Sequence, residues 1–163
     1  MSETWKQVVA LVVFLVVVFA VGNIGTPVTL KAVGPGAWYE GLRKPAWNPP
    51  DVVFGPVWTT LFAMMSVEAW LVWRDGGIAA HKLALGLFLV QLLLNGAWTL
   101  IFFGGFRVGL AMAEIVLLWG AILATMVLFW RVRAAAGWLM LPYFLWVSYA
   151  SSLNAGIWWL NRR

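Results

Sequence analysis

Residues 8–21 read VVALVVFLVVVFAV, a run of apolar side chains with no polar interruption. A helix or strand of a water-soluble domain would carry polar residues on its exposed face, and this run has none. A helix needs about 20 mostly apolar residues to cross the hydrocarbon core of a bilayer. The apolar segment extends outward to Trp5 and Ile24. It therefore predicts a transmembrane helix over 5–24.

The rest of the chain repeats this pattern four times. The predicted spans are 5–24, 53–73, 83–103, 108–130 and 137–160. Three of the connections between them are short, and short connections make neighbouring helices antiparallel. We therefore predict an all-α integral membrane protein, a single five-transmembrane-helix bundle that forms one domain over 1–163.

The composition supports a membrane protein of the multi-pass kind. The chain is 63% hydrophobic and 10% charged, whereas soluble domains are about 45–50% apolar and about 25% charged. The net charge of +5 would otherwise suggest a nucleic-acid partner. Here the basic residues flank the apolar runs, which is typical of membrane boundaries, so we expect a lipid bilayer and no nucleic acid as partner. The absence of cysteine excludes disulfides and thiolate sites.

The amino-terminal span has a second interpretation as a cleavable signal peptide. Lys6 precedes the apolar run, and the small residues Ala20 and Gly22 end it. Glu3 and Trp5 argue against cleavage, because signal peptides have a basic start without acidic or bulky residues. We expect the segment to be the first span.

Basic residues are balanced on the two sides of the bundle, so the positive-inside rule predicts no orientation.

The long connection over 25–52 differs from the others. The Gly-Pro-Gly sequence at 34–36 and three later prolines exclude a long helix. Trp38, Tyr39 and Trp47 are not typical of disorder. We expect an ordered cap over one end of the bundle. An aromatic belt at the membrane boundary is the alternative, and composition does not decide between the two.

Two predicted spans carry polar and aromatic residues at helical spacing. They are Gln91, Asn95, Trp98 and Thr99 in the third span and Tyr143, Trp146, Ala150 and Asn154 in the fifth. A lipid-facing amide is costly, so both stripes should face the bundle interior. Hydrogen bonds between helices and a ligand pocket would each explain them.

Glu68 and Glu114 are the acidic residues inside predicted spans. Intramembrane ionisable residues are functional candidates. The simpler expectation is that each pairs with a cation or snorkels to the boundary, since Glu68 is near Arg74 and Glu114 shares a helix face with Arg107.

The single histidine, His81, cannot form a metal cluster, and the sequence contains no phosphate-binding loop, zinc-protease motif or supported catalytic triad.

Four sequence blocks follow one another along the chain with a specific spacing. They are W-Y-x-x-L-x-K-P-x-W-x-P-P at 38–50 with P-x-W at 56–58, N-x-x-W with F-F-G at 95–104, L-P-Y-x-x-W at 141–146 and L-N at 153–154. This pattern resembles the translocator protein family, also called the tryptophan-rich sensory protein, TspO/MBR or peripheral benzodiazepine receptor family. The resemblance covers the whole chain and implies a five-helix bundle with a pocket beneath the first loop.

In that family the pocket accepts porphyrins and related tetrapyrroles, benzodiazepine-type ligands and, in animal members, cholesterol. The resemblance assigns ligand binding to Trp38, Trp47, Phe54, Gly55, Val57, Trp58, Phe62, Asn95, Trp98, Ala113, Leu117, Trp146, Ala150 and Leu153. Helical spacing independently selects Asn95, Trp98, Trp146 and Ala150. The resemblance implies a porphyrin or haem-type tetrapyrrole as ligand and requires no resident cofactor. Homodimers occur in the family, which makes a second copy of the chain a candidate partner.

The residue chemistry suits a tetrapyrrole. Tryptophan faces offer a large stacking area, and Lys31, Arg43 or Lys44 could pair with a propionate at the pocket mouth. The sequence departs from the family pattern at three places. Asp51 and Val52 stand where many members have a basic residue followed by tryptophan, and Leu110 stands where animal members have tryptophan. The cholesterol pattern near the carboxyl terminus is missing, which argues against cholesterol as the native ligand.

The leading functional hypothesis is a membrane receptor, sensor or transporter of tetrapyrroles without covalent catalysis. A second is an enzyme that degrades porphyrins with light or oxygen, using Trp47, Trp58 or Trp146 as redox-active side chains; the sequence does not decide whether the protein is an enzyme. A third is a small transporter that works through Glu114, and a fourth is a structural subunit with an empty pocket.

Overall fold

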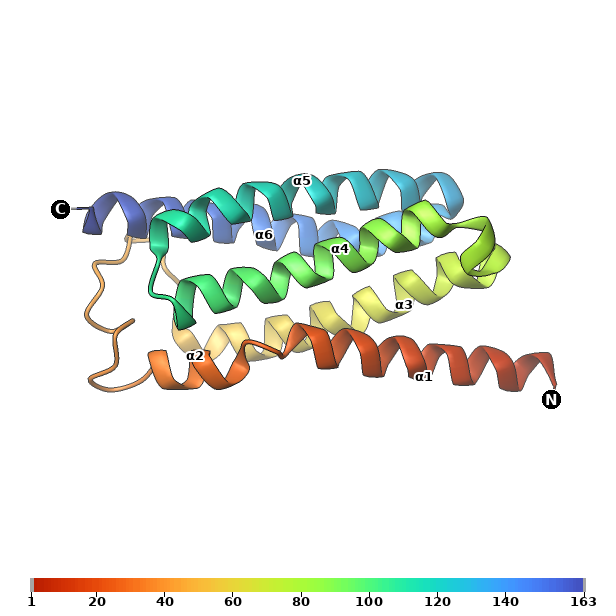
Figure 1. Ribbon diagram of the computed structural model, residues 1–163, viewed down its shortest axis with the longest axis horizontal. Helices are drawn as coiled ribbons and strands as arrows, with labels where there is room; N and C mark the ends of the chain where they lie inside the picture. Colours follow the sequence, from red (N-terminus) through yellow and green to blue (C-terminus); the bar gives the residue numbers. More distant parts are fainter. Residues whose placement is uncertain (1, 163) are drawn as a thin grey trace.

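The computed structural model describes residues 2–162 (Figure 1). Within that range the chain forms five long helices and no strand. These are α1 (Glu3–Gly22), α3 (Phe54–Ala80), α4 (Lys82–Thr99), α5 (Val108–Val132) and α6 (Ala134–Asn161). They lie side by side, with the amino terminus at one end of the bundle and the carboxyl terminus at the other. The predicted five-helix bundle is confirmed.

The helices have the length and composition of membrane spans. The segments that contain α1, α3, α4 and α5 are each long and apolar enough to cross a bilayer. The fifth, α6, is equally long but carries Ser148, Ser151 and Asn154 among other polar residues, and it packs along α5 (Figure 1). Valines 8, 12 and 16 of α1 are exposed on the outside of the bundle. Only lipid would solvate such a surface well, so the protein is an integral membrane protein.

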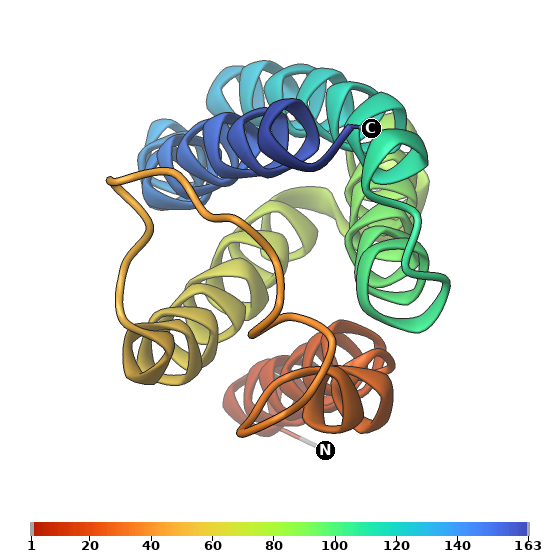
Figure 2. The ribbon, with the colours of Figure 1, turned by 90° about the vertical axis from the view of Figure 1, so that its left-hand side faces the viewer.

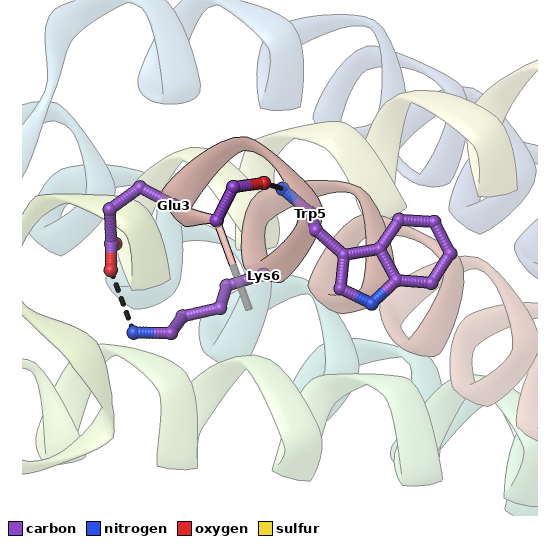
Figure 3. Close-up of polar contacts among 4 residues, drawn as sticks. Glu3, Trp5 and Lys6 are labelled. Atoms are coloured by element: carbon purple, nitrogen blue, oxygen red, sulfur yellow. Dashed lines mark hydrogen bonds and ion pairs between the residues drawn. The ribbon is translucent and has the colours of Figure 1, made fainter.

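The start of α1 is fixed by local polar contacts (Figure 3). The Ser2 hydroxyl caps the helix by accepting a hydrogen bond from the Trp5 backbone N–H at 3.3 Å. One turn of helix brings the Lys6 ammonium to 2.7 Å from the Glu3 carboxylate. Trp5 is exposed beside them, a typical position for tryptophan at the membrane boundary.

The predicted loop over 25–52 is wrong in its first part, because residues Thr26–Ala32 form a short helix, α2. Pro27 lies in the first turn of α2, where the missing backbone N–H has no helical partner to lose. The Asn23 side chain accepts a hydrogen bond from the Thr26 hydroxyl at 3.1 Å. This contact stabilises the bend between α1 and α2.

The predicted end of the second span at residue 73 is also wrong, because α3 continues to Ala80. The helix is broken by a kink at Gly77, whose φ of 76° and ψ of −176° are not helical but are accessible to glycine. A short second helical segment continues from this kink to Ala80. The connection to α4 is therefore shorter than the sequence predicts.

The remaining part of the long connection forms the expected cap (Figure 2). It passes beside α6 before it returns, through the short 3-10 helix η1 (Asp51–Val53), to the start of α3. The Asn161 side chain exchanges two hydrogen bonds with the Arg43 backbone, at 3.0 and 2.9 Å. The Tyr149 hydroxyl donates to the Trp47 carbonyl at 2.6 Å. These bonds hold the loop against α6, as expected for an ordered cap.

The last turn of α4 widens into a π-helix, η2 (Leu100–Gly104), before the chain turns into α5. Phe106 in this turn has a φ of 55°, which is unusual for a residue with a side chain. Its ring packs against Trp38 of the cap, with 4.8 Å between ring centres. The cap therefore packs against the turn between α4 and α5, and each stabilises the other.

A substitution at Gly137 would test how closely α5 and α6 pack. A Cβ atom at Gly137 would lie 2.8 Å from the Cβ, Cγ and Cδ2 atoms of Trp130. We expect Gly137→Ala to lower the free energy of unfolding by about 1–3 kcal/mol, because the indole must shift. Gly120→Ala is the control, since a Cβ there meets no atom within 4 Å. Thermal unfolding in detergent would compare the two variants, and equal shifts would contradict the packing argument.

Candidate ligand-binding cavity

A cavity of about 460 Å³ lies beneath the cap. This volume falls in the range of small-molecule sites. Its walls come from the loop end of α1, from α2, α3, α4 and α6, and from the cap itself. Nine of the lining residues are aromatic: Phe19, Tyr39, Phe54, Trp58, Phe62, Trp98, Phe102, Phe103 and Trp146. The cavity is therefore suited to a flat apolar molecule.

The structure brings together most of the residues that the sequence assigned to a ligand pocket. Nine of them line the cavity: Phe54, Gly55, Trp58, Phe62, Asn95, Trp98, Trp146, Ala150 and Leu153. All four residues that helical spacing selected are in this set. Binding of a ligand by these residues stays a prediction.

Three of the other assigned residues lie near the cavity without lining it. Trp38 packs on Phe102 with 5.7 Å between ring centres, so it supports the wall from behind. Val57 packs into the main hydrophobic core. Trp47 is 55% exposed and lies in a shallow groove on the outside of α6 with Trp159.

Ala113 and Leu117 lie on the outer face of α5, away from the cavity. Leu117 is 66% exposed, and Ala113 is exposed one turn before it. The buried face of α5 carries Ala111, Ile115 and Leu118 instead. Because an α-helix turns by 3.6 residues, positions 113 and 117 cannot share that face. Their assignment to the pocket has no support in the structure.

The cavity also uses residues that the sequence did not single out. Most come from the first helix and its extension: Phe19, Gly22, Asn23, Thr26, Thr29, Leu30 and Val33. The uniformly apolar α1 has no polar stripe to mark an inner face. The polar residues Asn23, Thr26 and Thr29 at its loop end are the only local signal. Asn154 and Thr99, which were in the periodic stripes, line the cavity as well.

Hydrogen bonds between helices hold the polar residues of the wall. The Trp98 indole N–H donates to the Asn154 side-chain oxygen at 3.0 Å, and the Asn154 amide donates to the Val108 carbonyl at 3.0 Å. These bonds join α4, α6 and α5. At the cavity floor the Asn95 amide donates to the Tyr143 hydroxyl at 3.3 Å. Asn95 and Asn154 thus link helices and also line the cavity. Hydrogen bonding between helices and a place in the cavity wall therefore both account for the two polar stripes.

Two tryptophans of the wall differ from Trp98 in their polar contacts. Trp58 packs on Phe62 with 5.3 Å between ring centres, and Trp146 packs edge-on to Phe54 at 5.8 Å. Within residues 2–162 neither indole N–H donates a hydrogen bond, whereas those of Trp98 and Trp119 do. Both rings are half-buried, and an indole N–H favours a hydrogen-bond acceptor where one is within reach. Each ring therefore keeps an N–H that no group of the described chain accepts.

The expected lysine or arginine partners for a propionate do not line the cavity. Asp51 is the charged residue among its lining residues. Lys44 contacts the wall from the cap, with its ammonium 4.5 Å from the centre of the Tyr39 ring. Tyr39 is buried at the cavity edge and donates its hydroxyl to Asn48 at 3.3 Å.

One side of the cavity has exposed residues on both of its edges. Asn23 and Leu30 form the edge on the α1 and α2 side, and Gly55 and Thr59 form the edge on α3. All four are exposed to the outside of the bundle. The cavity thus opens sideways between α2 and the start of α3 as well as lying under the cap.

The predicted partners of Glu68 and Glu114 are absent from the described chain. Glu68 is fully buried, and Glu114 is 8% exposed. Within residues 2–162 no Lys, Arg or His lies at ion-pair distance from either carboxylate. Arg74 instead lies over the Trp70 ring, 5.2 Å from its centre. The expectation that these acids pair with cations or snorkel is therefore wrong, because their helix faces point into the core.

The pKa of Tyr39 would test whether the cap holds Tyr39 and Asp51 close together. Burial and the negative charge of Asp51 raise the pKa of Tyr39 from 10.0 to about 12, although its hydrogen bond to Asn48 lowers the pKa slightly. Because the folded state holds this proton more tightly, Tyr39 contributes stability below pH 10, and that contribution is lost as the pH rises through about 12.

We expect Asp51→Asn to move the Tyr39 pKa back toward its ordinary value. The ring-carbon NMR signal of labelled tyrosine would follow the titration, and Tyr39→Phe would assign it. An unchanged pKa in Asp51→Asn would show that the loop does not hold these two groups together.

The sequence matches a known family over nearly its full length. The profile of the TspO/MBR family matches residues 11–160. Protein CrtK of Rhodobacter capsulatus is 43% identical over 131 residues, which are 78% of this chain and 80% of that protein. The human translocator protein is 42% identical over 123 residues, or 74% of this chain and 73% of its own. Tryptophan-rich protein TspO of Chlorobaculum tepidum is 41% identical over 161 residues, or 96% and 98%. The chain therefore belongs to the TspO/MBR family.

Proposed function

We propose that the protein is a membrane receptor, sensor or transporter that binds a porphyrin or related tetrapyrrole in the cavity beneath the cap. The observation that carries this proposal is the aromatic wall, in which Trp58, Trp98 and Trp146 lie on three different helices around one cavity. Aromatic rings bind flat π-systems through stacked and edge-on contacts, each contributing about 0.5–1.5 kcal/mol beyond the buried area. Benzodiazepine-type ligands share the flat aromatic character and would use the same wall.

The polar groups of the wall suit the rim of such a ligand. The indole N–H groups of Trp58 and Trp146 are available to acceptor atoms, and Asn95 lies at the floor. Asp51 lies at the cap end of the cavity, where its charge acts on Tyr39, and it would repel a carboxylate placed beside it. The propionates of a porphyrin would therefore turn away from Asp51 and toward the ammonium of Lys44 above Tyr39.

The opening between α2 and α3 supports entry from the bilayer. Exposed Leu30 and Thr59 flank this opening at the level of the loop end. Porphyrins are largely apolar and partition into membranes, so a side entrance would admit them without passage through the cap. The names of the relatives, translocator protein and tryptophan-rich sensory protein, are consistent with transport or sensing.

Replacing the wall tryptophans tests the proposal. We expect Trp58→Leu and Trp146→Leu each to raise the Kd for protoporphyrin IX between about twofold and tenfold, because each removes an aromatic contact. Trp159→Leu is the matched control, since that ring is 62% exposed and outside the cavity. The absorbance of the porphyrin would report binding to purified protein in the dark, because tryptophan emission changes with the variants themselves.

Saturable binding with one site per chain is expected for the wild-type protein and for Trp159→Leu. A linear response in the wild-type protein, or equal Kd values in all three variants, would overturn the assignment of the cavity. A time-dependent loss of porphyrin absorbance under light that requires Trp58 or Trp146 would instead favour the degrading enzyme.

A further inference from the structure

The cavity has one edge that faces the outside of the bundle. Five lining residues form this edge, which we call the side opening: Asn23, Thr26, Leu30, Gly55 and Thr59. All five are exposed. They belong to the segments Glu3–Ala32 and Asp51–Ala80, which are both long and apolar enough to cross a membrane. The side opening therefore joins the cavity to the bilayer.

The side opening exists because α2 turns away from α3. α1 packs along α3, whereas α2 packs on α4 and η2 and makes no backbone contact with α3 within the described residues (Figure 2). Two glycines allow this close approach to α4. A Cβ atom at Gly25 would overlap the side chain of Thr99, and one at Gly96 would lie 2.8 Å from the Cγ2 atom of Ile24. The bend between α1 and α2 is thus held on α4, which keeps α2 away from the start of α3.

The polar side chains of the side opening are hydrogen-bonded within the chain. The Asn23 amide donates to the Phe19 carbonyl at 2.9 Å, and its oxygen accepts from the Thr26 hydroxyl at 3.1 Å. The Thr59 hydroxyl donates to the Gly55 carbonyl at 3.0 Å. Such bonds let polar side chains face an apolar medium, because their donors are already paired. A hydrocarbon chain can therefore cross the side opening without leaving a hydroxyl donor unpaired.

The cap edge of the cavity has the opposite character. Asp51 is the charged residue of the lining, and the Lys44 ammonium lies over the ring of Tyr39. The Tyr39 hydroxyl donates to Asn48. At the side opening, by contrast, Leu30 is 73% exposed and adds apolar surface. A ligand that uses both edges is amphiphilic, with polar groups beneath the cap and an apolar part directed to the bilayer.

We propose that the side opening binds the hydrocarbon chain of the ligand, so that the cavity takes a tetrapyrrole esterified with a long-chain alcohol. The ring lies beneath the cap, and the chain passes between α2 and α3 into the lipid. A cavity of about 460 Å³ suits a ring system, and a long chain folded beside the ring would exceed it. This inference rests on the proposed tetrapyrrole site and names the class of tetrapyrrole that the site takes.

The side opening changes which ligands fit more than how tightly they bind. A hydrocarbon chain gains free energy when it leaves water, but the chain of a free ligand already lies in the bilayer. Passage through the side opening therefore changes the affinity little. A blocked opening, however, forces the chain into a cavity that the ring already fills. The quantity that tests the inference is the ratio of the Kd values of a long-chain ester and a short-chain ester.

The experiment compares two ligands that differ only in their chain. The monododecyl and monomethyl esters of protoporphyrin IX carry the same ring and one carboxylate each, so the charges of Asp51 and Lys44 act on both alike. The protein would be placed in nanodiscs of one lipid composition, and the porphyrin absorbance would give both Kd values in the dark. We expect the wild-type protein to bind the two esters with Kd values within about threefold of each other.

Two variants narrow the side opening. Gly55→Leu adds a side chain where a Cβ atom meets no other atom within 4 Å, and Thr59→Trp enlarges the residue one turn later. We expect each variant to raise the Kd of the dodecyl ester about tenfold more than that of the methyl ester, because only the long chain needs the passage.

Gly120→Leu is the matched control for these variants. A Cβ atom at Gly120 also meets no atom within 4 Å, and Gly120 lies on α5 outside the lining of the cavity. This variant should leave both Kd values unchanged.

The outcomes separate this inference from the proposed function. Wild-type protein that binds the methyl ester but not the dodecyl ester would have a tetrapyrrole site without a passage for the chain, which overturns the inference and leaves the proposed function in place. Equal losses of both esters in Gly55→Leu and Thr59→Trp would also overturn it, because the chain would then leave by another route. If neither ester nor protoporphyrin IX itself binds saturably, the proposed function and the inference are both wrong.

Discussion

The interior of a bilayer offers no water to polar groups, and this constraint shapes the whole molecule. Backbone N–H and C=O groups must pair within each span, which explains why the apolar segments are helices. Polar side chains in those helices must find partners in the bundle. Asn154 meets this requirement for three helices at once, because it accepts from Trp98 and donates to the Val108 carbonyl. At Glu68 and Glu114 this requirement is not met by hydrogen bonds within the described chain.

The cavity follows from the way the cap is fastened. Prolines 45, 49 and 50 keep this part of the loop free of helix, and a turn closed by the Asn48 N–H and the Pro45 carbonyl redirects the chain. The loop therefore crosses the end of the bundle without filling it. Its anchor points lie on α6, at Asn161 and Tyr149. Tyr39 fills the space between the cap and the α4 turn, where its ring packs on Phe102 and Phe103. Around the space beneath the cap, aromatic rings of separate helices meet edge-on, as Phe19 does with Phe62, Phe54 with Trp146 and Trp58 with Tyr143.

Much of the fold was predictable, and the errors have physical causes. Apolar length locates the spans because the thickness of the bilayer is fixed. It does not locate helix ends, so α2 and the continuation of α3 through Gly77 were missed. Helical spacing found Asn95, Trp98, Trp146 and Ala150 because polar groups mark an inner face. It gave no information on the cavity wall from α1, where every face is apolar. Ala113 and Leu117 came from resemblance alone, and nothing in their own sequence context marks α5 as turned away from the cavity.

Glu68, Gln91 and Glu114 contrast with the amides that join the helices. Replacing buried ionic groups with apolar residues of similar size is often neutral or stabilising, so stability alone does not account for two carboxylic acids in the core. Asn95 and Asn154 do not carry this penalty, since both are hydrogen-bonded. Both amides line the cavity, whereas Glu68, Gln91 and Glu114 do not. The two amides that join helices are therefore also part of the cavity wall.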